Sequence, residues 1–162
     1  MLRNVQSRTF RASDAPFAIV ASRYNERYVE AMLRAAKAEL KRAGVRKLRI
    51  IRVPGAYEIP LIAARLASRS AGSNPDSKAP AAIICLGVIL RGETVHAAHI
   101  GEAVSRALMD IQVRYQIPII HEVLLLENES QARVRCLGAK HNRGAEAAQT
   151  ALAMAQVMRA AS

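Results

Sequence analysis

A short segment at residues 91–96 combines residue types that could bind an anion and move protons. Gly92, Glu93 and Thr94 follow an apolar run and precede a helical pattern, so their backbone N–H groups would lie at a helix N-terminus. Such a terminus favours a phosphate or another anion through its dipole and its unpaired donors. His96 stands at the start of the same helix, where a neutral imidazole could transfer protons near pH 7. A histidine that only caps or packs there is the alternative.

Two further side chains extend this chemistry. Arg135, in a later helical pattern, offers a fork of N–H donors that suits phosphate, although most helical arginines simply face water. Tyr24 follows an apolar run and could stack on a planar ring, or pack as a partly buried aromatic. Phosphate binding, ring stacking and proton transfer are therefore the functions that these residue types indicate.

Apolar runs that predict strands alternate with patterns that predict helices. Asn25 could cap the first helix, Gly44 would end it, and Pro60 would have to lie in the first turn of the second. The expected strands are residues 17–21, 48–53, 82–86 and 117–126, and the expected helices are residues 26–43, 57–68, 96–115, 129–136 and 144–159. Strands this apolar, alternating with helices, are typical of a parallel sheet covered on both faces. We therefore predict an α/β fold, a three-layer α/β/α sandwich around a four-stranded parallel sheet.

In such a sheet the ligand crevice lies beyond the carboxyl ends of the strands, where helix N-termini also point. The candidate segments for a site are therefore those that follow the strands, at residues 22–25, 54–60, 87–96 and 121–128. Tyr24 lies in the first of these segments and His96 ends the third, so both are expected at the same edge of the sheet.

The length of 162 residues predicts one domain with a single core. We assign residues 17–162 to that domain. Residues 1–16 lack a clear core pattern and are interpreted as an N-terminal arm that could contact a neighbouring subunit. Residues 70–80 are polar and contain Pro, Gly and Ser, which predicts a surface connection and not a domain boundary.

Composition argues against several classes of protein. Hydrophobic residues make up 51% of the chain, but no apolar run approaches the roughly 20 residues that span a bilayer, so no membrane protein is expected. The N-terminus does not resemble a secretory signal, which predicts a cytoplasmic location. Cys85 and Cys136 show no metal-ligand spacing and are interpreted as reduced packing residues. The net charge of +11 lacks the interleaved aromatics of a nucleic-acid surface, and we interpret it as a basic surface that attracts anionic substrates.

Four motifs stand in register along the chain: SRYN at residues 22–25, GAYEIP at residues 55–60, RGETVH at residues 91–96 and KHNRG at residues 140–144. Together with the order and separation of the strands between them, these motifs resemble the lumazine synthase family. The similarity runs from about Phe17 to the end of the chain.

The resemblance implies a flavodoxin-like fold, which agrees with the strands and helices predicted above. It implies a transferase of riboflavin biosynthesis that condenses 5-amino-6-(D-ribitylamino)uracil with 3,4-dihydroxy-2-butanone 4-phosphate. The products are 6,7-dimethyl-8-ribityllumazine, phosphate and water. It further implies that no metal and no organic cofactor is used, and that the protein is a homo-oligomer built from pentamers with active sites between adjacent subunits.

The same resemblance assigns roles to individual residues. His96 matches the histidine proposed to transfer protons, so it is the candidate catalytic residue. Tyr24, beside Asn25, matches the aromatic that stacks on the pyrimidine. The further matches to the family's contacts with the ribityl chain and the pyrimidine are Ala56, Tyr57, Glu58, Val88, Ile89 and Leu90.

Glu93 and Thr94 match the pair whose backbone amides receive the phosphate, and Arg135 matches the arginine that pairs with it. Three positions depart from the family pattern. Glu93 places a carboxylate beside the expected phosphate, which is tolerable only if its side chain points away. His121 stands where an aromatic residue of the neighbouring subunit contacts the pyrimidine, so it could stack or donate a hydrogen bond. Ala139 stands near the family's usual lysine, which leaves the local geometry and the assembly size open.

Three other functions stay open on the sequence. An archaeal-type riboflavin synthase shares the fold, but its reaction has no phosphate for Arg135 and residues 91–96 to bind. A non-catalytic flavin-binding or shell-forming protein would not need His96, Glu58 and Arg135 together. Nucleic-acid binding is the third alternative, and its expected mark is an affinity that falls steeply with salt.

Overall fold

The computed structural model describes residues 14–69 and 78–162. Its centre is a parallel four-stranded sheet in the order β2-β1-β3-β4, the order of flavodoxin-like folds. The strands are β1 (Phe17–Ser22), β2 (Leu48–Val53), β3 (Ile83–Leu90) and β4 (Ile119–Leu126). The predicted arm at residues 1–16 and the predicted loop at residues 70–80 lie largely outside the described residues.

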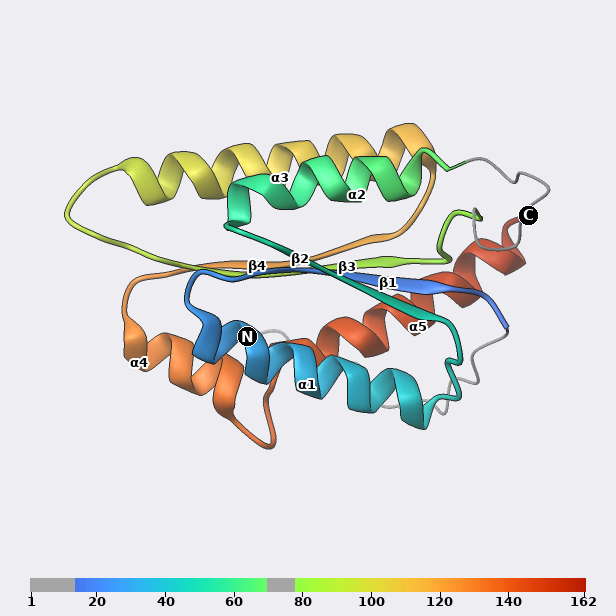
Figure 1. Cartoon of the computed structure of the whole chain (residues 1–162), viewed down its shortest axis with the longest axis horizontal. Coiled ribbons are helices and arrows are strands. Elements are labelled where there is room, and N and C mark those ends of the chain that lie inside the picture. Colours follow the sequence, from blue (N-terminus) through green and yellow to red (C-terminus); the bar gives the residue numbers. More distant parts are fainter. Residues whose placement is uncertain (1–13, 70–77) are drawn as a thin grey trace.

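Helices cover both faces of the sheet, which confirms the predicted three-layer sandwich (Figure 1). One face carries α2 (Ile59–Ala67) and α3 (His96–Tyr115), and the other carries α1 (Glu26–Arg42), α4 (Glu129–Ala132) and α5 (Arg143–Ala160). A short 3₁₀ turn, η1 (Ala56–Glu58), precedes α2, and a π-helical turn, η3 (Arg133–Leu137), follows α4. Within the described ranges, none of these helices is long and apolar enough to cross a membrane.

Strand β1 lies inside the sheet, and all six of its residues are buried. Phe17, Ile19 and Ala21 belong to the core under α1 and α5, while Ala18 and Val20 belong to the core under α2 and α3. This division follows from the period of two residues, which sends successive side chains to opposite faces of a strand. Both faces are covered, so the strand is continuously apolar, as its sequence indicated.

Strand β3 is longer than the sequence predicted. The apolar run predicted a strand at residues 82–86, and Gly87, a residue type that weakens a strand interior, directly follows it. In the structure Gly87 pairs with Val123 of β4, and the ladder continues to the pair of Leu90 with Leu126. Backbone hydrogen bonding to β4 therefore outweighs the low strand propensity of one glycine, and residues 87–90 form the end of the strand.

The predicted helix boundaries hold in part. Gly44 ends α1 as predicted, with a φ of 85° that favours glycine, and its N–H donates to the carbonyl of Lys41 over 3.0 Å. Pro60 does lie in the first turn of α2. The helix predicted to begin at Tyr57, however, begins at Ile59, because residues 56–58 form the separate turn η1.

Both cysteines are free and buried, as predicted. Cys85 lies in β3 and Cys136 lies in η3. Burial raises the pKa of the Cys85 thiol, and burial, followed by the nearby carboxylate of Glu122, raises the pKa of Cys136 to about 11. Both thiols are therefore protonated at neutral pH and act as small apolar side chains.

Helix α5 approaches α1 very closely at Gly144. A Cβ atom at this position would lie 2.0 Å from the carbonyl oxygen of Met32, which is backbone and cannot rotate away. The side chain of Asn142 accepts a hydrogen bond from the Gly144 N–H over 2.9 Å and thereby caps α5. A residue without a side chain is thus required where the cap brings the two helices together.

Gly144→Ala should lower the free energy of unfolding by about 3 kcal/mol or more, because the helices must separate to admit the methyl group. The gain in helix propensity from Gly to Ala is only about 1 kcal/mol and does not offset this cost. Chemical denaturation measures the difference. Gly92→Ala is the matched control, since a Cβ atom there meets nothing within 4 Å. Equal stability of the two variants would contradict the close approach.

Candidate active site

A pocket of about 690 Å³ opens at the carboxyl ends of β1, β2 and β3. We call it the carboxyl-end pocket. It is lined by Tyr24, Asn25, Gly55, Ala56, Tyr57, Glu58, Val88, Ile89, Leu90, His96, His99, Ile100 and Ala103. Strands β1 and β3 are neighbours, and the helices that follow them, α1 and α3, cover opposite faces of the sheet (Figure 1). Open α/β sheets bind ligands at this position, and the volume is in the range of small-molecule sites.

Asn25 joins the ends of β1 and β3. Its Nδ2 donates a hydrogen bond to the carbonyl oxygen of Val88 over 2.8 Å, between positions 63 residues apart in the chain. Asn25 is the N-cap residue of α1, as predicted, but its side chain makes no capping hydrogen bond. Its backbone is left-handed, with a φ of 56°, which asparagine tolerates better than most residues. The side chain therefore fixes the distance between two strand ends that line the pocket.

The turn after β2 is held by Glu58. The Glu58 carboxylate accepts a hydrogen bond from the backbone N–H of Gly55 over 2.8 Å. A Cβ atom at Gly55 would lie 3.0 Å from both this carboxylate and the ring of Tyr24, so the ring lies close over the turn. The ring is nevertheless accessible, because Tyr24 is 72% exposed and Tyr57 is 65% exposed. Two accessible aromatic rings and a fixed turn thus form one wall of the pocket.

Helix α3 forms another wall and brings two imidazoles into the pocket. His96 is the first residue of this helix, and His99 lies three residues later, on the same face. Both residues are exposed and line the pocket. Ile100 and Ala103 continue this face and supply an apolar surface. The wall therefore combines groups that can exchange protons with an apolar area that can cover a ring.

The three residues predicted to bind phosphate do not line the carboxyl-end pocket of this chain. Glu93 and Thr94 are exposed in the turn directly before α3, next in sequence to His96. Arg135 is exposed in η3, in the helical layer opposite to α3. Burial raises the pKa of Glu122 above its ordinary value. Nearby positive charges oppose this shift, mainly that of Arg143 and to a smaller extent that of Arg135. Arg135 thus belongs to the surroundings of β4 and α5 in its own chain.

His121 also lies outside the carboxyl-end pocket, on β4. The N–H of Val123 donates to its Nδ1 over 3.2 Å, so the proton of the neutral ring is on Nε2, which lies 2.7 Å from Oγ of Ser105. Ser105 in turn donates to the carbonyl of Gly101 over 2.8 Å. Burial lowers the pKa of His121, so its ring is neutral at pH 7. The side chain is held on the α3 side of the edge strand.

Comparisons with known proteins assign the chain to a family. A family model described as 6,7-dimethyl-8-ribityllumazine synthase matches residues 14–159. A protein of that name from Stenotrophomonas maltophilia (strain R551-3) is 37% identical over 146 residues, which cover 89% of each chain. One from Xanthomonas campestris pv. campestris (strain B100) is 35% identical over 150 residues, 91% of this chain and 92% of the relative. The chain belongs to the 6,7-dimethyl-8-ribityllumazine synthase family.

For this lumazine synthase family member, the structure gathers the residues predicted to contact the pyrimidine and the ribityl chain, except His121, around one pocket with His96. It leaves His121 and the predicted phosphate residues Glu93, Thr94 and Arg135 outside that pocket. Their roles stay predictions. Within residues 14–69 and 78–162, no three His, Cys, Asp or Glu side chains lie together as a metal site requires.

Four further residues line the pocket that were not predicted from the sequence: His99, Ile100, Ala103 and Gly55. A helical period would have found three of them. Starting from His96, positions three, four and seven residues later lie on one face of a helix. Gly55 carried a weaker signal, because its place in the turn depends on the contact of Tyr24 with the backbone.

Replacing Asn25 separates its two roles. Asn25→Gly keeps the left-handed backbone accessible but leaves the buried carbonyl of Val88 without its partner, which should cost about 1 to 2 kcal/mol of unfolding free energy. Asn25→Ala should cost about 1 kcal/mol more, because alanine resists a positive φ. Chemical denaturation of both variants gives the comparison. An alanine variant as stable as the glycine variant would argue against any backbone constraint at this position.

Proposed function

We propose that this chain condenses 5-amino-6-(D-ribitylamino)uracil with 3,4-dihydroxy-2-butanone 4-phosphate to give 6,7-dimethyl-8-ribityllumazine, phosphate and water. This is the penultimate step of riboflavin biosynthesis. The observation that carries the proposal is the carboxyl-end pocket, in which an accessible Tyr24 ring, the turn at residues 55–58 and His96 surround one space. The names of the relatives, with about nine-tenths of the chain aligned, support the same reaction.

In this proposal the pyrimidine stacks on Tyr24, and backbone groups of residues 88–90 bind the edge of its ring. The pairing of β3 with β1 ends at Leu86, so no strand pairs with residues 88–90 on the β1 side. Backbone N–H and C=O groups that face this side, apart from the Val88 carbonyl bound by Asn25, are therefore available to a ligand. The turn at residues 56–58 holds the ribityl chain. The hydrogen bond from the Gly55 N–H to the Glu58 carboxylate supports this role, since a fixed turn loses little entropy on binding.

Proton transfer is assigned to His96. The amine of the pyrimidine attacks the ketone, water leaves to give an imine, phosphate is eliminated, and the ring closes with loss of a second water. Each step moves a proton, and general acid–base catalysis contributes roughly 10² to 10⁴-fold. Holding two substrates together also accelerates such a reaction strongly. His99, one turn further along α3, lies close enough to influence the charge of the same space.

The phosphate is assigned to the backbone amides of Glu93 and Thr94 and to Arg135 of an adjacent subunit. In its own chain Arg135 lies in the helical layer opposite to α3, so it does not complete the pocket that contains His96. A neighbouring chain could supply both Arg135 and His121, which would place the active site between subunits. This arrangement requires an oligomer, and we propose assembly into pentamers.

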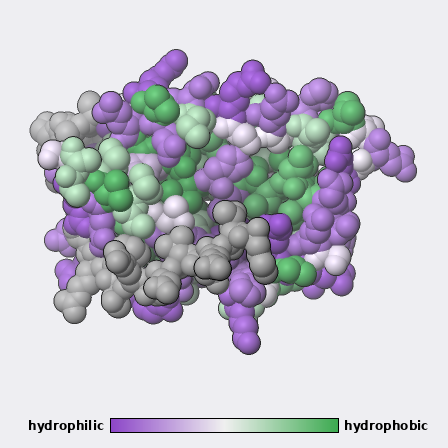
Figure 2. Space-filling model, turned by 180° about the vertical axis from the view of Figure 1, so that it is seen from behind, coloured by the Kyte–Doolittle hydropathy of each residue, from purple (hydrophilic) through white to green (hydrophobic). Residues whose placement is uncertain are grey.

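Exposed apolar side chains support such an assembly. Leu61 on α2 and Met109 and Val113 on α3 are 71%, 57% and 68% exposed. Figure 2 shows apolar side chains gathered in the middle of the face seen from behind, with hydrophilic ones around them. Contiguous apolar surface on a charged protein is typical of an interface.

A cytoplasmic location is part of the proposal and is supported by the two unpaired cysteines.

The reaction itself provides the first test. The purified protein, with no metal added, should release phosphate and form a fluorescent lumazine only when both substrates are present. A colorimetric phosphate assay and fluorescence measure the two products. Failure to form product under these conditions would contradict the enzymatic proposal. Formation of riboflavin from the lumazine alone would instead favour the archaeal-type riboflavin synthase.

Mixing two impaired variants, at a butanone phosphate concentration well below the raised KM, tests whether subunits share the site. His96→Ala should lower kcat by about 10 to 10⁴-fold, and Arg135→Ala should mainly raise the KM for the butanone phosphate. Co-assembled in equal amounts, the two variants should recover about a quarter of the sites, because half of the pockets retain His96 and half of their neighbours retain Arg135. Steady-state kinetics of the mixture measures the recovery. A mixture no more active than the separate variants would place both groups in one subunit.

A further inference from the structure

A second pocket, of about 370 Å³, lies at the amino ends of β1 and β2. We call it the amino-end pocket. It is lined by Pro16, Phe17, Ala18, Lys47, Leu48, Arg49, Leu66, Arg69, Lys78 and Pro80. The six residues of β1 separate it from the carboxyl-end pocket by about 17 Å, given the rise of a strand. No residue lines both pockets, so a ligand in one would not touch the other.

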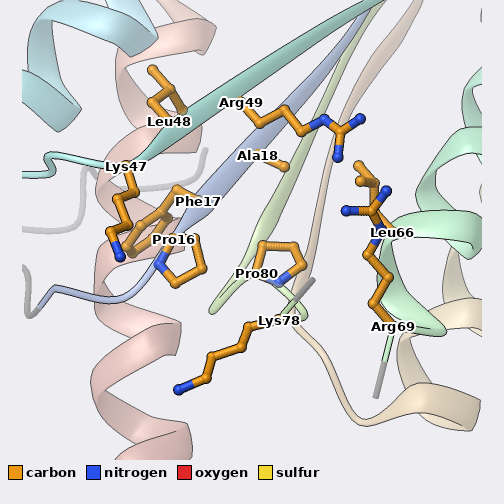
Figure 3. A pocket seen from close by; sticks show the side chains of 10 residues that line it. All are labelled: Pro16, Phe17, Ala18, Lys47, Leu48, Arg49, Leu66, Arg69, Lys78 and Pro80. Atoms are coloured by element: carbon orange, nitrogen blue, oxygen red, sulfur yellow. The ribbon is translucent and has the colours of Figure 1, made fainter. Parts of the chain in front are cut away.

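The charged residues of the amino-end pocket all have the same sign. Its lining includes Lys47, Arg49, Arg69 and Lys78, and no acidic residue is among the described residues that line it. In Figure 3 the guanidinium groups of Arg49 and Arg69 lie on one side of the pocket, and the ammonium groups of Lys47 and Lys78 lie on the other. The carboxyl end of α2 adds only about half a negative charge there. Lys47, Arg49 and Lys78 alone therefore give the pocket lining an excess of positive charge.

The floor between these cations is apolar. Leu66 and Phe17 are almost fully buried, and Pro16, Leu48 and Pro80 complete the lining (Figure 3). A simple solvated basic surface would not have such a concave apolar floor. The volume matches one small organic molecule and is too small for a segment of duplex or of folded protein. Cations on two sides of an apolar floor fit a ligand that has anionic groups and an apolar portion.

We propose that the amino-end pocket binds a small organic polyanion, a molecule with at least two negative charges from phosphate groups and an apolar ring or chain. Lys47 directly precedes β2, and Arg49 is its second residue. These two side chains and Lys78 form charge-assisted hydrogen bonds to the anionic groups. The apolar portion covers Leu48 and Leu66. This site is separate from the proposed condensation and does not depend on it.

Isothermal titration calorimetry with ADP and with inorganic pyrophosphate tests this proposal. ADP carries phosphates and a ring, whereas pyrophosphate carries the charges alone, so ADP should bind more tightly. The double variant Lys47→Gln, Arg49→Gln removes two exposed cations at the start of an edge strand. It should weaken ADP binding at least about tenfold, since each lost charged hydrogen bond is worth roughly that much.

The matched control is Arg34→Gln, Lys37→Gln, which removes two exposed cations from α1, away from both pockets. It should change the affinity for ADP by less than about twofold. Equal weakening by the two double variants would contradict the proposal, because the binding would then follow net charge alone. Loss of ADP binding in a Thr94→Ala, Arg135→Ala variant would also contradict it, by placing the anion at the proposed active site. The proposal would also be contradicted if ADP did not bind, or if pyrophosphate bound more tightly than ADP.

Discussion

The parallel pairing of β1 with β3 is the constraint on which the rest of this structure depends. Parallel strands end at the same edge of a sheet, so the turns after β1, β2 and β3 meet although they are far apart in the sequence. The chain crosses from one face of the sheet to the other between these strands, which leaves a crevice between their ends. The hydrogen bond from Asn25 to Val88 links the two strand ends across that crevice. A pocket for a planar substrate follows from this topology before any catalytic side chain is considered.

The same topology divides the functional groups of one chain between two helical layers. His96 begins α3 on one face, and Arg135 lies in η3 on the other. Arg135 does not line the pocket that contains His96 in its own chain. In the proposed reaction the phosphate binds near both groups, so the proposal requires that a second chain supplies Arg135. The exposed apolar surface of α2 and α3 is consistent with this view.

Much of the fold could be predicted because local patterns and tertiary packing agree. The buried strand β1 is apolar at every position except Ser22, and Gly44 and Pro60 stand where a helix ends and begins. The errors lie where packing overrides local preference. Asn25 has the side chain of a helix cap, but a strand carbonyl 63 residues away takes its hydrogen bond. The predicted strand ended at Leu86, but residues 87–90 also pair with β4.

The sequence by itself determined the class of the fold, the family and the residues around the carboxyl-end pocket, because motifs next to strand ends carry that information locally. Only the tertiary structure decided that His121 is held by Ser105 and that Arg135 does not line the pocket that contains His96. It alone also revealed the amino-end pocket, whose cations come from the start of β2, from the residues just beyond α2 and from those before β3. The physical reason is that charges and apolar surfaces become neighbours only when distant segments pack, and no local pattern records which segments will meet.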